Sequence, residues 1–356
     1  MVRPERYFRD LWDGKRQKGI DRLVLLALTL CSFPYDLAVR LRAMAYAAGL
    51  FPSRGLPRPV ISVGNLTVGG TGKTPAVAML AQFFISRGKR VAVLSRGYGG
   101  SLTGREEIVS DGTTILLSPE EAGDEPYLLA SSVPGLMVVI GADRYRAGLL
   151  AMERLAPDIF ILDDGFQHLR LKRDLNILLL DSRRPFGNGR VLPAGVLREP
   201  LPAGERADLV IYTRSSEGEE TVHFQEKPAC RAFHHLVGVS PPNREGTLPF
   251  AELKGHTVVA FAGIADPGAF FRDLAEEGLN LAATIPFPDH CRYGEGEIAR
   301  ILGAAAACGA DSLITTAKDG VKLGAYRKRL PNLYTAALEM WVADPGPLVA
   351  LLEKLL

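Results

Sequence analysis

A glycine-rich segment that ends in a lysine and a threonine is the pattern in this chain best suited to chemistry. It spans residues 60–75 and reads VISVGNLTVGGTGKTP. Glycines let backbone N–H groups turn towards phosphate oxygens, and a helix that begins at the turn adds a favourable dipole. Lys73 would contact the outer phosphates and the Thr74 hydroxyl would bind Mg²⁺. The predicted phosphate-binding residues are Gly69, Gly70, Thr71, Gly72, Lys73 and Thr74.

Two consecutive aspartates form a second acidic signal. Asp163 and Asp164 follow an apolar run that begins at residue 158, and Gly165 comes directly after them. A phosphate-loop enzyme needs a carboxylate at the tip of a neighbouring strand to fix the Mg²⁺ shell. We therefore predict that this pair of aspartates supplies a carboxylate to a Mg²⁺ site that includes Thr74. The two signals indicate a nucleoside triphosphate and Mg²⁺, but they do not identify the group that receives the phosphate.

The segments around these residues predict an α/β fold. Most strand candidates are continuous apolar runs, as in strands buried on both faces, so we expect a mostly parallel sheet flanked by helices, of the P-loop NTPase type. A polar stretch at 214–228 precedes a smaller C-terminal α/β unit, and an apolar helical segment lies at the N-terminus. The predicted strands are 59–63, 90–94, 137–140, 158–162, 175–180, 209–212, 257–262, 281–285 and 312–315.

The length and composition of the chain agree with this predicted fold. A chain of 356 residues suggests roughly two domains. We divide it into an N-terminal membrane-associating segment (1–55), a P-loop core (56–230) and a smaller C-terminal α/β domain (231–356), with the second boundary anywhere between 214 and 255. The hydrophobic share of 47% excludes a disordered chain, and the net charge of +2 argues against a nucleic-acid binder. Four scattered cysteines predict no zinc site and suit a reducing cytosol.

The charge is distributed unevenly. The first 58 residues carry 11 Lys/Arg and 5 Asp/Glu, a net +6, which leaves −4 on the other 298. The uncharged run Leu23–Tyr35 has 13 residues, whereas a spanning helix needs about 20. Pro34 is expected to break the helix, and charged Asp36, Arg40 and Arg42 follow it. We expect two short apolar helices that lie in a membrane interface. A helical hairpin packed on the body, a signal peptide and a true span are the alternatives.

A series of blocks between about residue 60 and 320 resembles the tetraacyldisaccharide 4′-kinase family, the lipid A 4′-kinases of Gram-negative bacteria. The phosphate loop has Thr67 where the standard pattern has its first glycine, and it resembles the family's loop in this respect too. The basic, apolar N-terminal segment also fits. The blocks are Gly64–Pro75, Ser95–Gly99, Glu121–Pro126, Ala142–Tyr145, Leu162–His168, Leu192–Gly195, Leu197–Pro200, Phe287–His290 and Thr315–Asp319.

The resemblance implies transfer of the γ-phosphate of ATP to the 4′-hydroxyl of a tetraacylated glucosamine disaccharide 1-phosphate. It implies a peripheral or monotopic protein at the cytoplasmic face of the bacterial inner membrane. The expected partners are the lipid disaccharide and an anionic membrane surface, with no nucleic acid and no obligate protein partner inferred.

The resemblance also assigns residues. Glu199 joins the aspartates around the metal. Asp124 matches the catalytic base, with His290 as its partner and Lys73 as the third catalytic residue. Thr316 and Lys318 are assigned to the nucleotide. The arginines of the substrate group could equally meet the nucleotide. The assigned substrate residues are Asn65, Arg96, Tyr98, Arg144, Gln167, His168 and Arg198.

Two other hypotheses remain open at this stage. A P-loop ATPase of the partition or metallochaperone type shares Gly-Gly-x-Gly-Lys-Thr, but it places a signature lysine where this chain has Val68. A membrane-docked nucleotide switch would give the acidic residues no catalytic role.

The segment Cys291–Tyr293 departs from the family's usual sequence after His290, where more histidine or acidic residues are expected.

Overall fold

The computed structural model describes residues 4–16, 18–215, 223–242, 246–289 and 291–356. The chain forms two compact units from non-contiguous segments. Unit 1 consists of Met1–Ser95, Asp143–Phe233 and Val342–Leu356, and unit 2 of Arg96–Ala142 and His234–Trp341. The division at residues 55 and 230 stays a prediction, and part of the predicted 214–228 loop lies outside the described residues.

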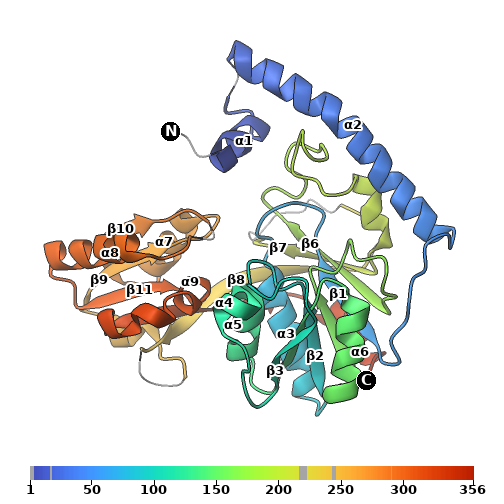
Figure 1. Ribbon diagram of the computed structural model, residues 1–356. Helices are drawn as coiled ribbons and strands as arrows, with labels where there is room; N and C mark the ends of the chain where they lie inside the picture. Colours follow the sequence, from blue (N-terminus) through green and yellow to red (C-terminus); the bar gives the residue numbers. More distant parts are fainter. Residues whose placement is uncertain (1–3, 17, 216–222, 243–245, 290) are drawn as a thin grey trace. The chain divides into compact units, whose positions relative to one another are not determined.

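Unit 1 is built on a parallel sheet with the order β8-β7-β6-β1-β5-β2 (Figure 1). Helix α3 packs on β1, β2 and β5, and α6 packs on β2. Because helices cover the sheet, every residue of β1, β2, β5 and β7 is buried, as their apolar runs predict. The elements are β1 (Val60–Gly64), α3 (Lys73–Ile85), β2 (Val91–Ser95), α6 (Arg144–Arg154), β5 (Ile159–Asp163), β6 (Leu175–Asp181), the 3₁₀ helix η1 (Leu201–Arg206), β7 (Leu209–Thr213), β8 (Ala229–Ser240, which continues into unit 2) and α10 (Gly346–Glu353).

Unit 2 has a second α/β arrangement, in which β10, β9, β11 and β12 are parallel neighbours. One face of this sheet packs on Phe270 and Leu274 of α7, and the other on Ile298 and Ile301 of α8. Strands β3 and β4 pair antiparallel beside α5. The elements are β3 (Glu107–Asp111), α4 (Pro119–Ala122), α5 (Asp124–Ser132), β4 (Met137–Ile140), η2 (Phe250–Leu253), β9 (Thr257–Ala262), α7 (Pro267–Glu276), β10 (Asn280–Pro286), α8 (Glu295–Cys308), β11 (Ser312–Thr316), α9 (Ala317–Val321), η3 (Gly324–Arg329) and β12 (Leu333–Val342).

The N-terminal segment forms α1 (Pro4–Trp12) and α2 (Gly19–Ala47). The expected break at Pro34 is wrong, because α2 continues through it for 29 residues, about 43 Å. Proline has no N–H for the carbonyl of Leu30, and both residues lie on the exposed side of α2. The hydroxyls of Thr29 and Ser32 donate to the carbonyls of Leu25 and Thr29 one turn earlier.

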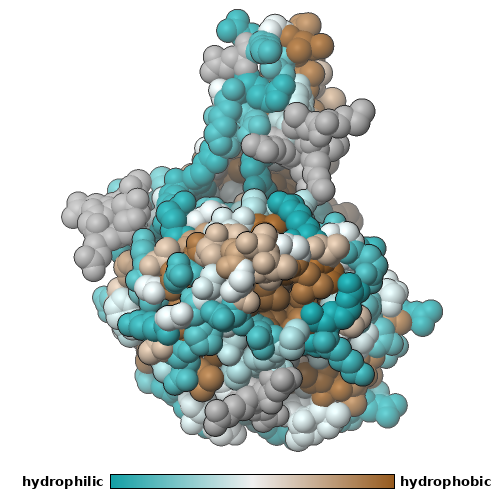
Figure 2. Space-filling model, turned by 90° about the vertical axis from the view of Figure 1, so that its left-hand side faces the viewer, coloured by the Kyte–Doolittle hydropathy of each residue, from teal (hydrophilic) through white to brown (hydrophobic). Residues whose placement is uncertain are grey.

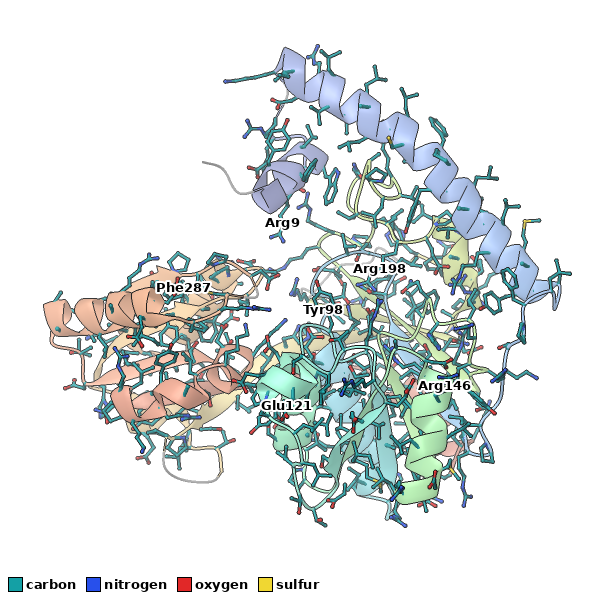
Figure 3. The ribbon with its side chains drawn as sticks, in the orientation of Figure 1. Arg9, Tyr98, Glu121, Arg146, Arg198 and Phe287 are labelled. Carbon is teal, nitrogen blue, oxygen red and sulfur yellow. The ribbon has the colours of Figure 1, made fainter. Side chains whose placement is uncertain are left out.

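One face of α2 forms an exposed apolar stripe. Its residues recur every three or four positions, which places them on one side of the helix. Figure 2 shows hydrophobic side chains at the top right of the upper helical part and hydrophilic ones along its left edge, and Figure 3 shows side chains projecting along the outer side of α2. Among the described residues, α2 has the length and composition to cross a membrane. The α2 stripe consists of Leu23, Leu26, Leu30, Phe33, Leu37, Leu41 and Met44.

Candidate active site

The predicted phosphate loop joins β1 to α3. Gly69 and Gly72 have φ values of +123° and +80°, a region that glycine adopts without steric cost. Thr213, at the end of β7, donates a hydrogen bond to the carbonyl of Thr71 at 3.1 Å and ties the loop to the sheet. Lys73 is the first residue of α3, so the unpaired N–H groups of the first turn follow the loop directly. This arrangement is suited to binding an anion.

A later segment of the chain pairs with the first half of the loop. Val68 donates its N–H to the carbonyl of Val196 at 2.8 Å, and Arg198 donates its N–H to the carbonyl of Leu66 at 2.7 Å. This pairing explains why two distant sequence blocks belong to one site, because it places Arg198 and Glu199 beside the loop.

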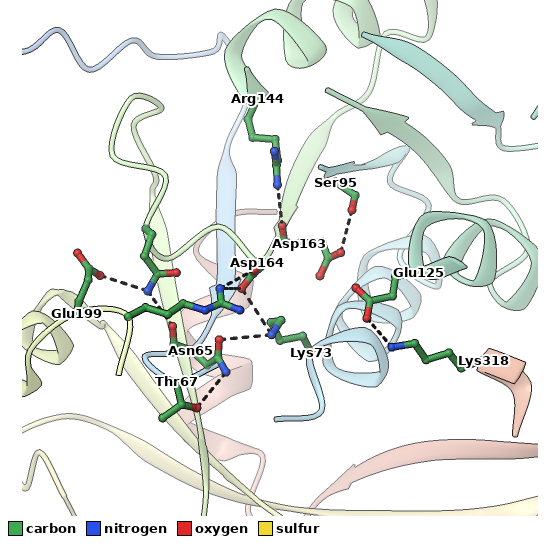
Figure 4. Close-up of polar contacts among 12 residues, drawn as sticks. Asn65, Thr67, Lys73, Ser95, Glu125, Arg144, Asp163, Asp164, Glu199 and Lys318 are labelled. Atoms are coloured by element: carbon green, nitrogen blue, oxygen red, sulfur yellow. Dashed lines mark hydrogen bonds and ion pairs between the residues drawn. The ribbon is translucent and has the colours of Figure 1, made fainter. Parts of the chain in front are cut away.

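Asp164 is the centre of an ion-pair network in unit 1 (Figure 4). The guanidinium of Arg198 donates to both of its carboxylate oxygens at 2.9 and 2.7 Å, and Lys73 Nζ lies 3.6 Å from Oδ1. Lys73 also donates to Oδ1 of buried Asn65 at 3.4 Å. Burial alone would raise the pKa of Asp164, but the charges of Lys73 and Arg198 hold the pKa of this carboxyl below its usual value. The site therefore holds an ionised carboxylate beside the loop lysine.

Asp163 lies at the carboxyl end of β5, in register with Val63 of β1. The Ser95 hydroxyl donates to its Oδ2 at 3.0 Å, and Arg144 donates to its backbone carbonyl at 3.4 Å. Ser95 is not among the predicted site residues, although it begins the block Ser95–Gly99. Two adjacent carboxylates beside a loop that ends in the Thr74 hydroxyl offer hard oxygen ligands, which are the ligands that suit Mg²⁺.

Glu199 is buried and held on both oxygens. Arg206 donates to Oε2 at 2.5 Å and to Oε1 at 3.2 Å, and Gln167 donates to Oε2 at 3.2 Å. Gln167 also donates to the carbonyl of Asn65 at 2.9 Å, which links Glu199 to the start of the phosphate loop. No sequence pattern marks Arg206, because its role depends on the packing of η1.

His168 follows Gln167 in the same segment of unit 1. Burial, and next the nearby charge of Arg144, lower the pKa of His168 to about 4. The imidazole is therefore neutral near pH 7, so it is suited to hydrogen bonding rather than to pairing with a phosphate charge.

In unit 2, Asp124 is the first residue of α5. The loop that carries Arg96 and Tyr98 packs tightly against the turn before it, since a Cβ on Gly123 would lie 2.6 Å from the Tyr98 carbonyl oxygen. A Cβ on Gly100 would lie 2.3 Å from the carbonyl oxygen of Glu121. These glycines allow the Tyr98 loop, with its exposed tyrosine side chain, to lie beside Asp124.

The short helix α9 and its C-cap residue contribute two lysines, four residues apart, that contact the first turn of α5. Lys318 Nζ donates to Glu125 at 3.1 Å, and Lys322 Nζ lies 3.5 Å from Asp124 Oδ2. Thr316 caps α9, because its hydroxyl oxygen accepts the N–H of Asp319. Sequence reasoning missed Lys322, although its spacing from Lys318 was a usable signal.

The site residues thus fall into two groups. Unit 1 brings together Asn65, the loop from Gly69 and Gly70 to Thr74, Arg144, Asp163, Asp164, Gln167, His168, Arg198 and Glu199, and unit 2 holds Arg96, Tyr98, Asp124, Thr316 and Lys318. His290 lies outside the described residues. The roles assigned to all these residues remain predictions.

Known proteins resemble the chain over nearly its whole length. Residues 24–356 match the family model described as tetraacyldisaccharide-1-P 4′-kinase. The tetraacyldisaccharide 4′-kinase of Geobacter metallireducens is 61% identical over 95% of this chain and all of its own length, and that of Geobacter sulfurreducens is 58% identical over 98% and 99%. The crystal structure of LpxK from Aquifex aeolicus in complex with ATP is 38% identical, has a TM-score of 0.80, and is matched over 93% of this chain and 99% of its own.

Proposed function

The chain belongs to the tetraacyldisaccharide-1-P 4′-kinase family, and from this premise we propose that it transfers the γ-phosphate of ATP to the 4′-hydroxyl of a tetraacylated glucosamine disaccharide 1-phosphate. The observation that carries the proposal is the loop lysine, Lys73, at the start of α3 beside the Asp164–Arg198 pair. Family membership favours this kinase activity over an ATPase or a nucleotide switch.

In this proposal the phosphates of ATP lie on the N–H groups of Gly69–Thr74, and Lys73 contacts the outer phosphates. Thr74, Asp163, Asp164 and Glu199 would belong around Mg²⁺, and Gln167 links Glu199 to the start of the loop at Asn65. The ion, when bound, supplies positive charge that stabilises the negative charge developing on the transferred phosphoryl group. Arg198 can bind a phosphate group in the same way that it binds Asp164, because a guanidinium makes bidentate contacts with phosphate oxygens as it does with carboxylate oxygens.

Asp124 is the proposed general base, with His290 as its partner. A sugar hydroxyl attacks poorly until a positioned base accepts its proton. As the bond forms between the 4′-oxygen and the γ-phosphorus, the bond from that phosphorus to the bridging oxygen of the leaving ADP breaks, and Asp124 takes the hydroxyl proton. The family resemblance supplies this role, and the location of Asp124 at a helix N-terminus, beside the exposed Tyr98 loop, is consistent with it.

We also propose that α2 attaches the protein to the cytoplasmic face of the inner membrane without spanning it. Among the described residues, hydrogen bonds connect the inner side of α2 to the rest of unit 1: Arg190 to Thr29, Tyr35 to the carbonyl of Arg198, and Arg42 to the carbonyl of Gln167. They extend from Thr29 to Arg42, about 20 Å of helix. A helix held in this way along its length can offer the α2 stripe to a lipid surface while it stays on the protein.

The test of the proposed activity is phosphate transfer by Lys73→Ala and Asp124→Ala. Both should reduce turnover by at least about 100-fold, since a charge-stabilising contact and a general base each contribute about that much. Asp124→Ala should still bind ATP. Lys172→Ala, which removes an exposed lysine from unit 1, serves as the matched control. Normal transfer by Lys73→Ala would rule out the loop assignment, and normal turnover by Asp124→Ala would rule out the base.

A further inference from the structure

Lys322 is a largely buried lysine that none of the steps above uses. Its side chain is 9% exposed, and its Nζ lies between two carboxylates of unit 2, 3.3 Å from Asp319 Oδ1 and 3.5 Å from Asp124 Oδ2. A charged ammonium is rarely buried unless it is paired. The contacts of Lys322 with both Asp319 and Asp124 therefore call for a functional explanation.

The Asp319 side of the pair is rigid. Asp319 is fully buried, and its Oδ2 accepts hydrogen bonds from the N–H of Gly263 and from the Thr316 hydroxyl, both at 2.8 Å. Tyr293 packs nearby, where burial and then the Asp319 carboxylate raise the pKa of its phenol. Asp319 therefore holds the Lys322 ammonium at a fixed point in the core of unit 2.

The Asp124 side is more open, since its side chain is 29% exposed. A carboxylate at the first position of a helix can turn freely unless a neighbour restrains it. The ammonium of Lys322 has three N–H groups, so it can contact Asp319 and restrain Asp124 together. The positive charge of Lys322 is already balanced by the negative charge of Asp319. Lys322 can therefore orient the Asp124 carboxylate without neutralising the negative charge of Asp124.

We propose that Lys322 is a positioning residue for phosphate transfer: anchored by buried Asp319, it holds the Asp124 carboxylate in the orientation that accepts the hydroxyl proton. This inference rests on the proposed role of Asp124 as base. Lys318 restrains the next residue, Glu125, at 3.1 Å, so α9 contacts both acids of the first turn of α5.

The test measures kcat and both KM values of the full-length protein, with ATP, Mg²⁺ and the tetraacylated disaccharide 1-phosphate in detergent micelles. Lys322→Met should lower kcat about 10- to 100-fold, as expected when a reacting group is misplaced by about 1 Å, with little change in either KM. Lys322→Arg, which keeps a cation, should recover most of the loss. The matched control is Arg329→Met, which removes an exposed ion pair with Glu295 in the same unit and should leave kcat unchanged.

A double-mutant cycle separates positioning from a structural role. In an Asp124→Asn background, Lys322→Met should cause no further loss of kcat, because there is no longer a base to orient. A full additional loss in the double variant, a normal kcat for Lys322→Met, or a rise in KM alone would overturn the proposal. Thermal melting checks folding, and Lys322→Gln, which keeps an N–H donor for Asp319, replaces Lys322→Met under the same expectations if that variant does not fold.

The double-mutant cycle also distinguishes failure of the proposed reaction from failure of the proposed role of Lys322. Near-normal turnover by Asp124→Asn would remove the base and, with it, the reason for positioning. An inactive Asp124→Asn together with a fully active Lys322→Met would leave the proposed reaction intact and refute only the role of Lys322.

Discussion

The α2 stripe permits a quantitative prediction about membrane binding. Leu23, Leu30 and Leu37 are 67%, 61% and 57% exposed. Complete burial of a leucine side chain contributes about 2 kcal/mol, so immersing the exposed 60% of each contributes about 1.2 kcal/mol, or about 3.6 kcal/mol for the three. The triple variant Leu23→Gln, Leu30→Gln, Leu37→Gln should therefore bind vesicles about 400-fold more weakly.

The assay is co-sedimentation with vesicles of phosphatidylethanolamine and phosphatidylglycerol at fixed salt. Leu149→Gln, at an exposed leucine of α6, is the matched control and should bind like the unaltered protein. Because Thr29, Tyr35 and Arg42 on the inner side of α2 are untouched, the helix should remain on unit 1. Unchanged vesicle binding by the triple variant would refute the assignment of the α2 stripe as the lipid-facing surface.

Two further predictions concern stability. Between pH 6.5 and about 4 the unfolded chain binds a proton at His168 that the folded chain does not, so stability falls as pH falls through this window. At pH 5 the loss of unfolding free energy is at most about 2 kcal/mol. Urea unfolding at pH 7 and pH 5 should show a smaller difference in unfolding free energy for His168→Gln than for the unaltered protein. An equal difference for the two proteins would refute His168 as the cause. Gly100→Ala should lower the melting temperature and turnover, because the new Cβ meets the backbone of Glu121 and Ala122. Gly296→Ala in α8, which meets nothing within 4 Å, should slightly raise stability, and equal melting temperatures for the two variants would contradict this account.

Much of the strand pattern could be predicted from the sequence, because fully buried strands are continuous apolar runs. The predicted strands at 59–63 and 158–162 correspond to β1 and β5 within one residue at each end. The missed strands β3, β8 and β12 are partly exposed and mix polar with apolar residues, as at His234 and His235 in β8, so they lack that signal.

The helix prediction failed at Pro34 for a physical reason. Proline is a strong local signal for the end of a helix. Its energetic cost inside a helix depends on whether the carbonyl one turn earlier is left without a hydrogen-bond partner, and here that carbonyl belongs to the exposed residue Leu30. A local rule could not foresee the hydrogen bonds of Tyr35 and Arg42 to the rest of unit 1, which support the second half of the helix.

The phosphate loop and the Asp163–Asp164 pair were recognisable because their chemistry requires particular residue types at particular spacings. Arg206 was not, since it acts on a carboxylate that only the folded chain brings near, and Lys322 was marked only by its spacing from Lys318, because its contact with Asp124 also depends on folding. Residues that bind a ligand tend to carry a sequence pattern, whereas residues that orient them are selected by tertiary packing.

The most direct test of the proposed reaction is the product itself. The purified protein would be incubated with ATP, Mg²⁺ and the tetraacylated disaccharide 1-phosphate, and the lipid would be analysed by mass spectrometry with fragmentation. The account predicts one added phosphate, on the non-reducing sugar at its 4′-oxygen, formed in step with ADP. ADP release with no change in lipid mass, or a phosphate on the reducing sugar, would contradict it.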